Sequence, residues 1–286
     1  MQKTTLLCMI SLIFFTLFLF PQSSPVKATM VLSVGGTGEG NYTSIQQAID
    51  QAVAGDTVLV YPGEYHEQLM ISSSIQLIGL DRNTTVINAS RQGDVITLAA
   101  DNITIHGFTL TGGELLFPRA AIYVTTTGNT VSDNIMTDNY YGMVLMSPAS
   151  HNHIVNNHIH HNHQCGIYFS GATYNILQDN IVHHHPFNGF GLYDFSNHNH
   201  MENNVLSYND LNGINIRDSY DNTVIQNTFT ANTHGLHVPP PRFHPVVENN
   251  VFIDNELDEQ HPSFFISLPA TVTLLFLGLL FFKRKT

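Results

Sequence analysis

Residues 157–167 read Asn-His-Ile-His-His-Asn-His-Gln-Cys-Gly-Ile, and this pattern of two polar positions five residues apart, with a glycine soon after, recurs along the chain. The first position returns every 23 or 24 residues, at Asn134, Asn157, Asn180, Asn204, Asn227 and Asn250. The second position is occupied by Asn139, Asn162, His185, Asn209, Asn232 and Asn255. A fixed period of this length, with apolar residues also at a constant phase, is typical of a solenoid whose coils bury their apolar faces against one another.

Each repeat also contains a glycine followed by apolar residues in alternation, as in Gly166-Ile167-x-Phe169. Alternation directs the two apolar side chains inward and the residue between them outward. A further apolar position precedes each ladder asparagine by three residues, so three short strands fit into about 23 residues. We therefore predict an all-β fold, a right-handed parallel β-helix with regular rungs over residues 120–258. The asparagine ladder is expected to be structural, because stacked amides at a tight bend hydrogen-bond one another and the backbone.

A short amphipathic helix is predicted over residues 42–54. Ile45, Ala48 and Ile49 recur there at helical spacing. Because an exposed terminal rung is an aggregation-prone edge, this helix is expected to cap the first coil.

Two apolar segments flank the predicted ectodomain, which covers residues 29–262. Residues 1–28 contain an apolar run that ends in Val26-Lys27-Ala28 and read as a signal peptide, with an uncleaved anchor as the alternative. Residues 263–282 carry no charge and match one crossing of a bilayer, and the basic tail 283–286 is expected on the cytoplasmic side. A buried helix or a processed sorting tail are the alternatives. The pattern predicts a secreted, single-pass protein anchored in the membrane by its C-terminal helix.

The charge distribution excludes polyanionic partners. Lysine occurs only in the first 27 residues and at the C-terminus, which leaves five arginines beside all 22 acidic residues in the central part of the chain. Such a surface repels nucleic acid and attracts cations. Cys165 is the one cysteine that follows the predicted signal peptide, so no intrachain disulfide is expected in the mature chain.

Several stretches resemble the right-handed parallel β-helix repeat proteins of the pectin-lyase-like superfold, in particular the NosD-like, carbohydrate-binding and sugar-hydrolase branch. They are the Gly55-Asp-Thr-Val-x-Val-x-Pro-Gly-x-Tyr opening, the strands Ile75-Gln-Leu-Ile-Gly79 and Asn102-Ile-Thr-Ile-His-Gly107, and the asparagine repeats themselves. The resemblance spans about residues 31–260. It implies the fold strongly and the activity weakly, because one fold hosts many functions.

The resemblance implies that sugars lie across the exposed face of one stacked sheet. The outward positions of the glycine-containing strands there combine aromatic and polar side chains, which suit neutral sugar rings. The predicted ligand-binding residues are Tyr168, Tyr193, Asn215, Arg217 and His237. The alternative is an ordinary solvated β-sheet face with scattered tyrosines.

Catalysis is the second question for this face. Lyases of the superfold pair acidic calcium ligands with an arginine or lysine base, and its hydrolases use clustered aspartates. Asp194, Arg217 and Asp218 form the grouping with suitable chemical types, and they are the catalytic candidates. The hydrolase signatures and the epimerase Asp-Pro-His-Asp motif are absent from the sequence. We therefore predict binding of a glycan or another cell-envelope component without catalysis, with a polysaccharide lyase or glycoside hydrolase as the alternative.

Histidine is abundant, with 17 residues in the chain. The repeat places His160 on His183 and His161 on His184, one rung apart. Imidazoles at that spacing on an acidic surface suit copper or zinc, and NosD-like proteins are associated with copper delivery. A NosD-like copper-binding accessory role is therefore the second alternative function. The competing interpretation is a set of exposed turn histidines that titrate near pH 6.5 and bind nothing.

Overall fold

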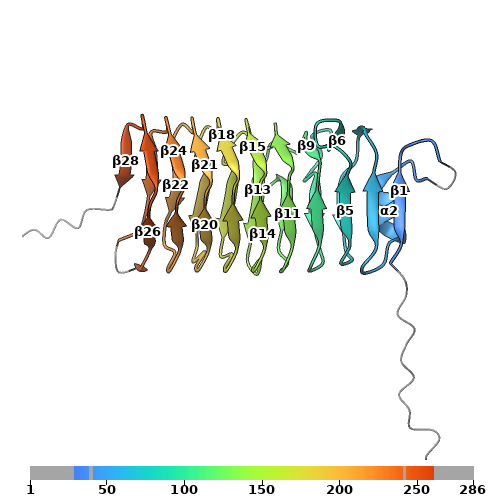
Figure 1. The fold of residues 1–286 in the computed structure, drawn as a ribbon, viewed down its shortest axis with the longest axis horizontal. Coiled ribbons are helices and arrows are strands. Elements are labelled where there is room, and N and C mark those ends of the chain that lie inside the picture. Colours follow the sequence, from blue (N-terminus) through green and yellow to red (C-terminus); the bar gives the residue numbers. More distant parts are fainter. Residues whose placement is uncertain (1–28, 39–40, 241–242, 261–286) are drawn as a thin grey trace, which may run out of the picture.

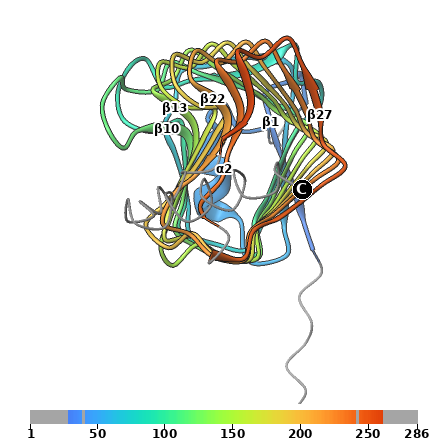
Figure 2. The same ribbon diagram turned by 90° about the vertical axis from the view of Figure 1, so that its left-hand side faces the viewer.

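The computed structural model describes residues 29–38, 41–240 and 243–260. In this part of the chain, three parallel sheets wind into a rod of stacked rungs (Figure 1). The prediction of an all-β parallel β-helix is confirmed. Viewed along the rod, the three sheets enclose one continuous interior (Figure 2).

Each sheet takes one strand from each successive rung. Sheet A contains β1 (Val31–Val34), β2 (Thr57–Val60), β5 (Gln76–Gly79), β8 (Thr104–His106), β11 (Thr130–Ser132), β14 (His153–Val155), β17 (Ile176–Gln178), β20 (His200–Glu202), β23 (Thr223–Ile225) and β26 (Val246–Glu248). Sheet B contains β3 (Gly63–Tyr65), β6 (Thr85–Asn88), β9 (Thr109–Thr111), β12 (Ile135–Thr137), β15 (His158–His160), β18 (Ile181–His183), β21 (Val205–Ser207), β24 (Thr228–Thr230) and β27 (Val251–Ile253). Sheet C contains β4 (Leu69–Ile71), β7 (Ile96–Leu98), β10 (Ala120–Val124), β13 (Tyr141–Met146), β16 (Ile167–Ser170), β19 (Phe190–Tyr193), β22 (Asn212–Ile216), β25 (His234–His237) and β28 (Leu257–Gln260).

The register of the sheets is the one that the repeat predicts. In sheet C, Ile167 pairs with Phe190 and Phe190 with Ile214, so apolar side chains stack rung on rung inside the rod. All three are fully buried. Burial of such side chains is the main stabilising contribution to folding, because it removes apolar surface from water.

The asparagine ladder connects the rungs at the bend between sheets A and B. Asn180 accepts hydrogen bonds at Oδ1 from the backbone N–H (3.0 Å) and the side-chain amide (3.1 Å) of Asn157. Its own amide donates to the Ile154 carbonyl (2.9 Å) and to Asn204 Oδ1 (3.0 Å). The expected structural role is confirmed, because each buried amide satisfies the rungs before and after it.

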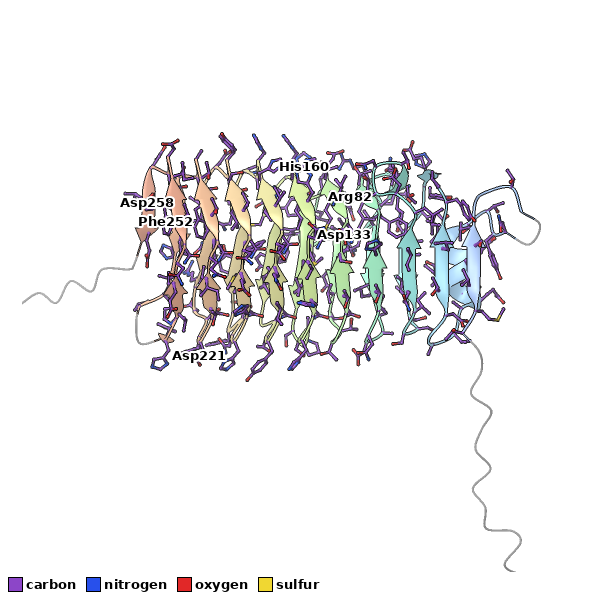
Figure 3. The ribbon with its side chains drawn as sticks, viewed as in Figure 1. Arg82, Asp133, His160, Asp221, Phe252 and Asp258 are labelled. Carbon is purple, nitrogen blue, oxygen red and sulfur yellow. The ribbon has the colours of Figure 1, made fainter. Side chains whose placement is uncertain are left out.

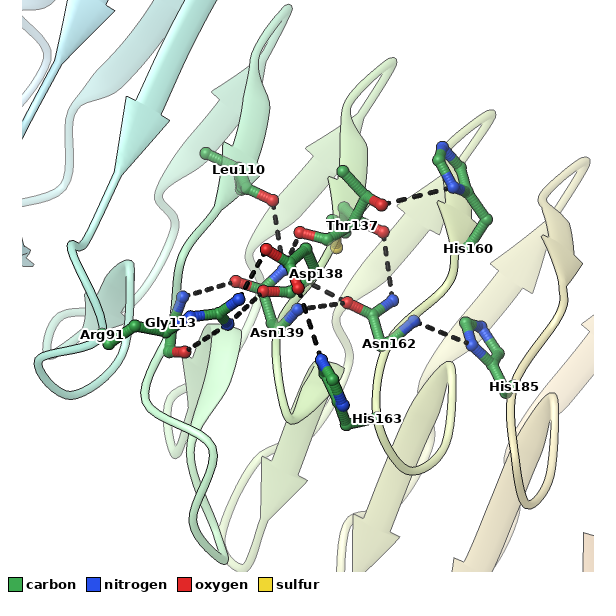
Figure 4. Close-up of polar contacts among 11 residues, drawn as sticks. Arg91, Leu110, Gly113, Thr137, Asp138, Asn139, His160, Asn162, His163 and His185 are labelled. Atoms are coloured by element: carbon green, nitrogen blue, oxygen red, sulfur yellow. Dashed lines mark hydrogen bonds and ion pairs between the residues drawn. The ribbon is translucent and has the colours of Figure 1, made fainter.

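The second ladder repeats this arrangement one bend further along each rung, and Figure 4 shows it from Asn139 through Asn162 to His185. The sequence interpretation missed a third ladder, at Asn129, Asn152, Asn175, Asn199 and Asn222. The residues that precede the ladder asparagines, such as His161 and Asp179, have a left-handed backbone with φ of 51° and 57°. This conformation turns the chain sharply and directs the side chains of these corner residues outward.

The N-terminal end is covered by helix α2 (Ile45–Gln51), whose buried residues are Ile45, Ala48 and Ile49. Ser44 is its N-cap, and the Glu67 carboxylate accepts the N–H groups of Ile45 and Gln46. A carboxylate at this end is favourable because the first N–H groups of a helix have no partner within it.

The helix is shorter than the predicted 42–54. Ala52 is already extended, with ψ of 142°, and the Asp56 carboxylate accepts the Val53 N–H. This contact stabilises a turn in place of a further helical turn.

The predicted signal peptide and the predicted membrane segment lie outside the described residues. Among the residues that the structure describes, no helix has the length and apolar character needed to cross a membrane.

Candidate functional site

The predicted sugar-binding face is the outer side of sheet C. Tyr168 lies between Tyr141 and Tyr193, with ring centroids 5.1 and 5.3 Å away. The Tyr193 hydroxyl accepts hydrogen bonds from the side-chain amides of Asn188 (2.9 Å) and Asn215 (3.3 Å). Burial raises the pKa of the Tyr193 hydroxyl above its ordinary value. The structure therefore brings Tyr168, Tyr193 and Asn215 together, but as a packed layer in which neighbouring rings cover both faces of Tyr168.

Two features close this layer. Residue 191 is glycine, and a Cβ there would lie 2.7 Å from the Tyr193 ring, so the missing side chain makes room for the tyrosine to fold back over the sheet. On the other side, Phe117 meets Tyr141 and Tyr168 edge-on, with centroids 6.3 and 6.0 Å away. This half of the predicted patch offers little free aromatic surface to a sugar.

The other half of the predicted patch is open. Arg217 and Asp218 form an ion pair of 3.5 Å, and their side chains are 72% and 66% exposed. They line a pocket of about 380 Å³ together with Ile216, His237, Pro239, Pro240 and Phe243. Three of the predicted site residues, Arg217, Asp218 and His237, are thus brought to one concave surface.

Asp194 lies one rung away from this pocket. Its Oδ2 accepts a hydrogen bond from the Ser170 hydroxyl at 2.8 Å. The neighbouring Phe195 N–H donates to the Asp218 carbonyl at 3.1 Å, which places the two aspartates on adjacent rungs. Catalysis by these residues, or calcium binding between them, remains a prediction.

A row of exposed aromatic rings continues the pocket along the turns that follow sheet C. We call Phe195, Tyr220 and Phe243 the aromatic corner. Phe195 is 61% exposed and is parallel to Tyr220, with centroids 6.3 Å apart and planes at 5°. Tyr220 contacts Phe243 at 4.7 Å. These rings were missed in the sequence, because they lie in turns of unequal length and not at a fixed phase of the repeat.

A second group of side chains lies on the outer face of sheet B. We call His158, His160, His161, His183 and His184 the histidine cluster. The predicted stacking is confirmed: His160 and His183 are parallel with centroids 5.2 Å apart, and His161 and His184 with centroids 4.9 Å apart. Figure 3 shows His160 and Asp221, which neighbours the aromatic corner, on opposite long edges of the rod.

Ring nitrogens in the histidine cluster face each other in pairs. His183 Nε2 lies 2.7 Å from His158 Nε2, and His183 Nδ1 lies 2.6 Å from His184 Nδ1. His160 Nδ1 lies 2.9 Å from His161 Nδ1. His158 was not among the predicted metal candidates, although it shares a face of its strand with His160.

The environment keeps the inner members of the cluster neutral. Burial, followed by the neighbouring imidazoles, lowers the pKa of His160 and of His183 to about 4. The pKa of His158 is lowered for the same main reason, burial. A neutral imidazole has a lone pair to offer, so these rings can act as hydrogen-bond acceptors or metal ligands near neutral pH.

Comparison with known families places this rod. A family model described as "Periplasmic copper-binding protein (NosD)" matches residues 49–260. The chain belongs to the NosD family. The resemblance noted in the sequence is confirmed by this match, which covers most of the chain.

Relatives outside the NosD model agree on the architecture. A cell surface glycoprotein of Methanothermus fervidus is 32% identical over 106 residues, which are 35% of this chain and 18% of that protein. The chain thus spans less than a fifth of that relative. The catalytic domain of a GH87 α-1,3-glucanase in complex with nigerose superposes with a TM-score of 0.65 at 15% identity, over 82% of this chain and 46% of the other. The mannuronan C-5 epimerase AlgE6 A-module of Azotobacter vinelandii gives 0.57 at 16% identity, over 75% and 73%. At these identities, the two structures show a shared fold alone.

The NosD description names copper, and the histidine cluster fits that metal in its donor chemistry. Imidazole is a ligand that copper accepts readily. In the described part of the chain, however, no group of three or more His, Cys, Asp or Glu side chains is arranged to hold a metal ion. The imidazoles meet in pairs, so the protein supplies two nitrogens at each meeting point.

Proposed function

We propose that the chain is a cell-surface binding protein of the NosD family that recognises a neutral glycan at the aromatic corner and the adjoining Arg217 pocket. The observation that carries this proposal is the continuity of exposed aromatic rings with a pocket lined by paired charges. The similarity to a cell surface glycoprotein and the carbohydrate-active structures that share the fold support it.

The chemistry of the pocket favours a neutral ligand. Arg217 and Asp218 compensate each other's charge, so together they offer donors and acceptors to sugar hydroxyls without requiring a charged sugar. The apolar faces of sugar rings pack on aromatic side chains, and Tyr220 and Phe243 provide such surfaces beside the pocket. The described part of the chain contains no lysine to attract an acidic polysaccharide.

The proposed location follows from the two ends of the sequence. We propose that residues 1–28 direct export and that residues 263–282 hold the protein in the membrane, with the rod outside the cytoplasm. The glycan-binding corner would then face other components of the envelope, which allows a surface role without turnover.

We expect a glycan array probed with the full-length protein to yield a neutral oligosaccharide ligand. Tyr220→Ala should weaken binding of that ligand at least tenfold in isothermal titration, because an aromatic ring at an interface commonly contributes more than about 1 kcal/mol. A reducing-sugar assay on the same ligand should show no new chain ends.

The matched control is Tyr208→Ala. Tyr208 is also an exposed ring, and Ala231 occupies the corresponding corner position one rung further with a similar backbone, φ of 52° in both. Equal affinities of wild type and Tyr220→Ala, or an array without any bound glycan, would overturn the proposal. Production of reducing ends would replace it with the hydrolase alternative.

A further inference from the structure

The histidine cluster has a geometry that stacking alone does not require. Parallel imidazoles one rung apart are a simple consequence of the repeat, as in the pairs His160–His183 and His161–His184. The nitrogen pairs are different, because they run along the strand and into the turn as well as between rungs. His183 is at the centre, with one ring nitrogen directed at His158 and the other at His184.

The distance between paired nitrogens selects a coordination geometry. Metal–imidazole bonds are about 2.0–2.1 Å long, so two nitrogens 2.7 Å apart that share a metal subtend an angle of about 80–90°. That angle suits neighbouring positions of a square-planar or tetragonal ion such as Cu(II) or Ni(II). Tetrahedral Zn(II) requires wider angles and, in structural sites, four protein ligands.

The surroundings of the cluster attract cations. His184 and Tyr208 line one side of a pocket of about 590 Å³, and the same pocket is lined by Asp210, Asp254 and Glu256. These carboxylates raise the local concentration of a divalent cation beside the imidazoles. The pocket also leaves room for the water molecules that a two-nitrogen site needs to complete its coordination.

We propose that the histidine cluster binds a divalent transition metal through the nitrogen pairs centred on His183, with Cu(II) preferred to Zn(II). His158 and His184 supply the second nitrogen of each pair, and water completes the shell. The site is independent of the glycan proposal, because the cluster and the aromatic corner lie on opposite edges of the rod (Figure 3). Two protein ligands make it a labile site, suited to carrying and passing on a metal.

The test is titration of the full-length protein with copper sulfate and with zinc sulfate, followed by electron paramagnetic resonance of the copper-loaded sample. We expect micromolar or tighter Cu(II) binding, at least tenfold weaker Zn(II) binding, and nitrogen hyperfine structure from imidazole. His183→Gln should weaken Cu(II) binding at least tenfold and remove that hyperfine structure.

Two further variants keep the result decisive. His151→Asn is the matched control, because His151 is an exposed corner histidine that stacks on Tyr174 away from the cluster, and its copper signal should match wild type. His158→Gln removes one nitrogen pair without touching the hub and serves if His183→Gln does not fold. An unchanged copper signal in the folded cluster variants, or tighter binding of Zn(II) than Cu(II), would overturn the proposal.

Discussion

Asn180→Ala is expected to lower the free energy of unfolding by about 2–4 kcal/mol, because it leaves buried polar groups without partners. Asn180 lies near the middle of the first ladder and is fully buried. Alanine would remove the acceptor of the Asn157 N–H and the donor to the Ile154 carbonyl. Urea denaturation followed by circular dichroism measures the change.

The control for this substitution is Asn83→Ala. Asn83 is exposed and makes its hydrogen bonds locally, to Asp81. Its replacement should change the free energy of unfolding by less than about 0.5 kcal/mol, the usual size of a surface effect. If Asn180→Ala were no more destabilising than Asn83→Ala, the ladder would not contribute to rung stacking as described.

His185→Asn is expected to raise the free energy of unfolding at pH 7 by about 1–2 kcal/mol, because it removes an unsatisfied buried donor. His185 takes the place of an asparagine in the second ladder, and its Nδ1 accepts the Asn162 N–H at 3.3 Å. The hydrogen is then on Nε2, which is buried without a partner. An asparagine would restore the amide geometry of the ladder above and below it.

The same substitution should flatten the dependence of stability on pH. Burial lowers the pKa of His185 to about 3, whereas an unfolded histidine titrates near 6.5. Between these values the unfolded chain binds more protons, so wild-type stability falls as the pH drops from about 6.5 towards 3. His160 and His183 act in the same direction, because their folded pKa is also lowered.

Thermal unfolding between pH 7 and pH 4.5, with EDTA present, measures this effect. We expect the melting temperature of wild type to fall over that range and that of His185→Asn to fall less. Parallel curves for the two proteins would contradict a buried, neutral His185.

The fold was predictable because the repeat has a physical cause. A ladder asparagine must meet another asparagine on the next rung, which imposes a constant period and exposes it to inspection. The third ladder at Asn129 and its successors has the same period and was detectable by the same test. The length of helix α2 was less predictable, because the Asp56 carboxylate that holds the turn after the helix competes with helical continuation.

The candidate sites were predictable only where strand register decides them. Register alone places His160 on His183, and the structure shows that contact. It does not decide that Tyr193 folds back over residue 191, because that depends on a rotamer and on the amides that hold its hydroxyl. The aromatic corner lies in turns outside the repeat, so no period identifies Phe243 as a neighbour of Tyr220.

The most direct test of the proposed function is a crystal structure of the full-length protein with its oligosaccharide from the array. The account predicts electron density for sugar rings against Tyr220 and Phe243, with hydroxyl groups at hydrogen-bond distance from Arg217 or Asp218. Density for the oligosaccharide over the packed tyrosine layer around Tyr168, with the Arg217 pocket empty, would contradict it.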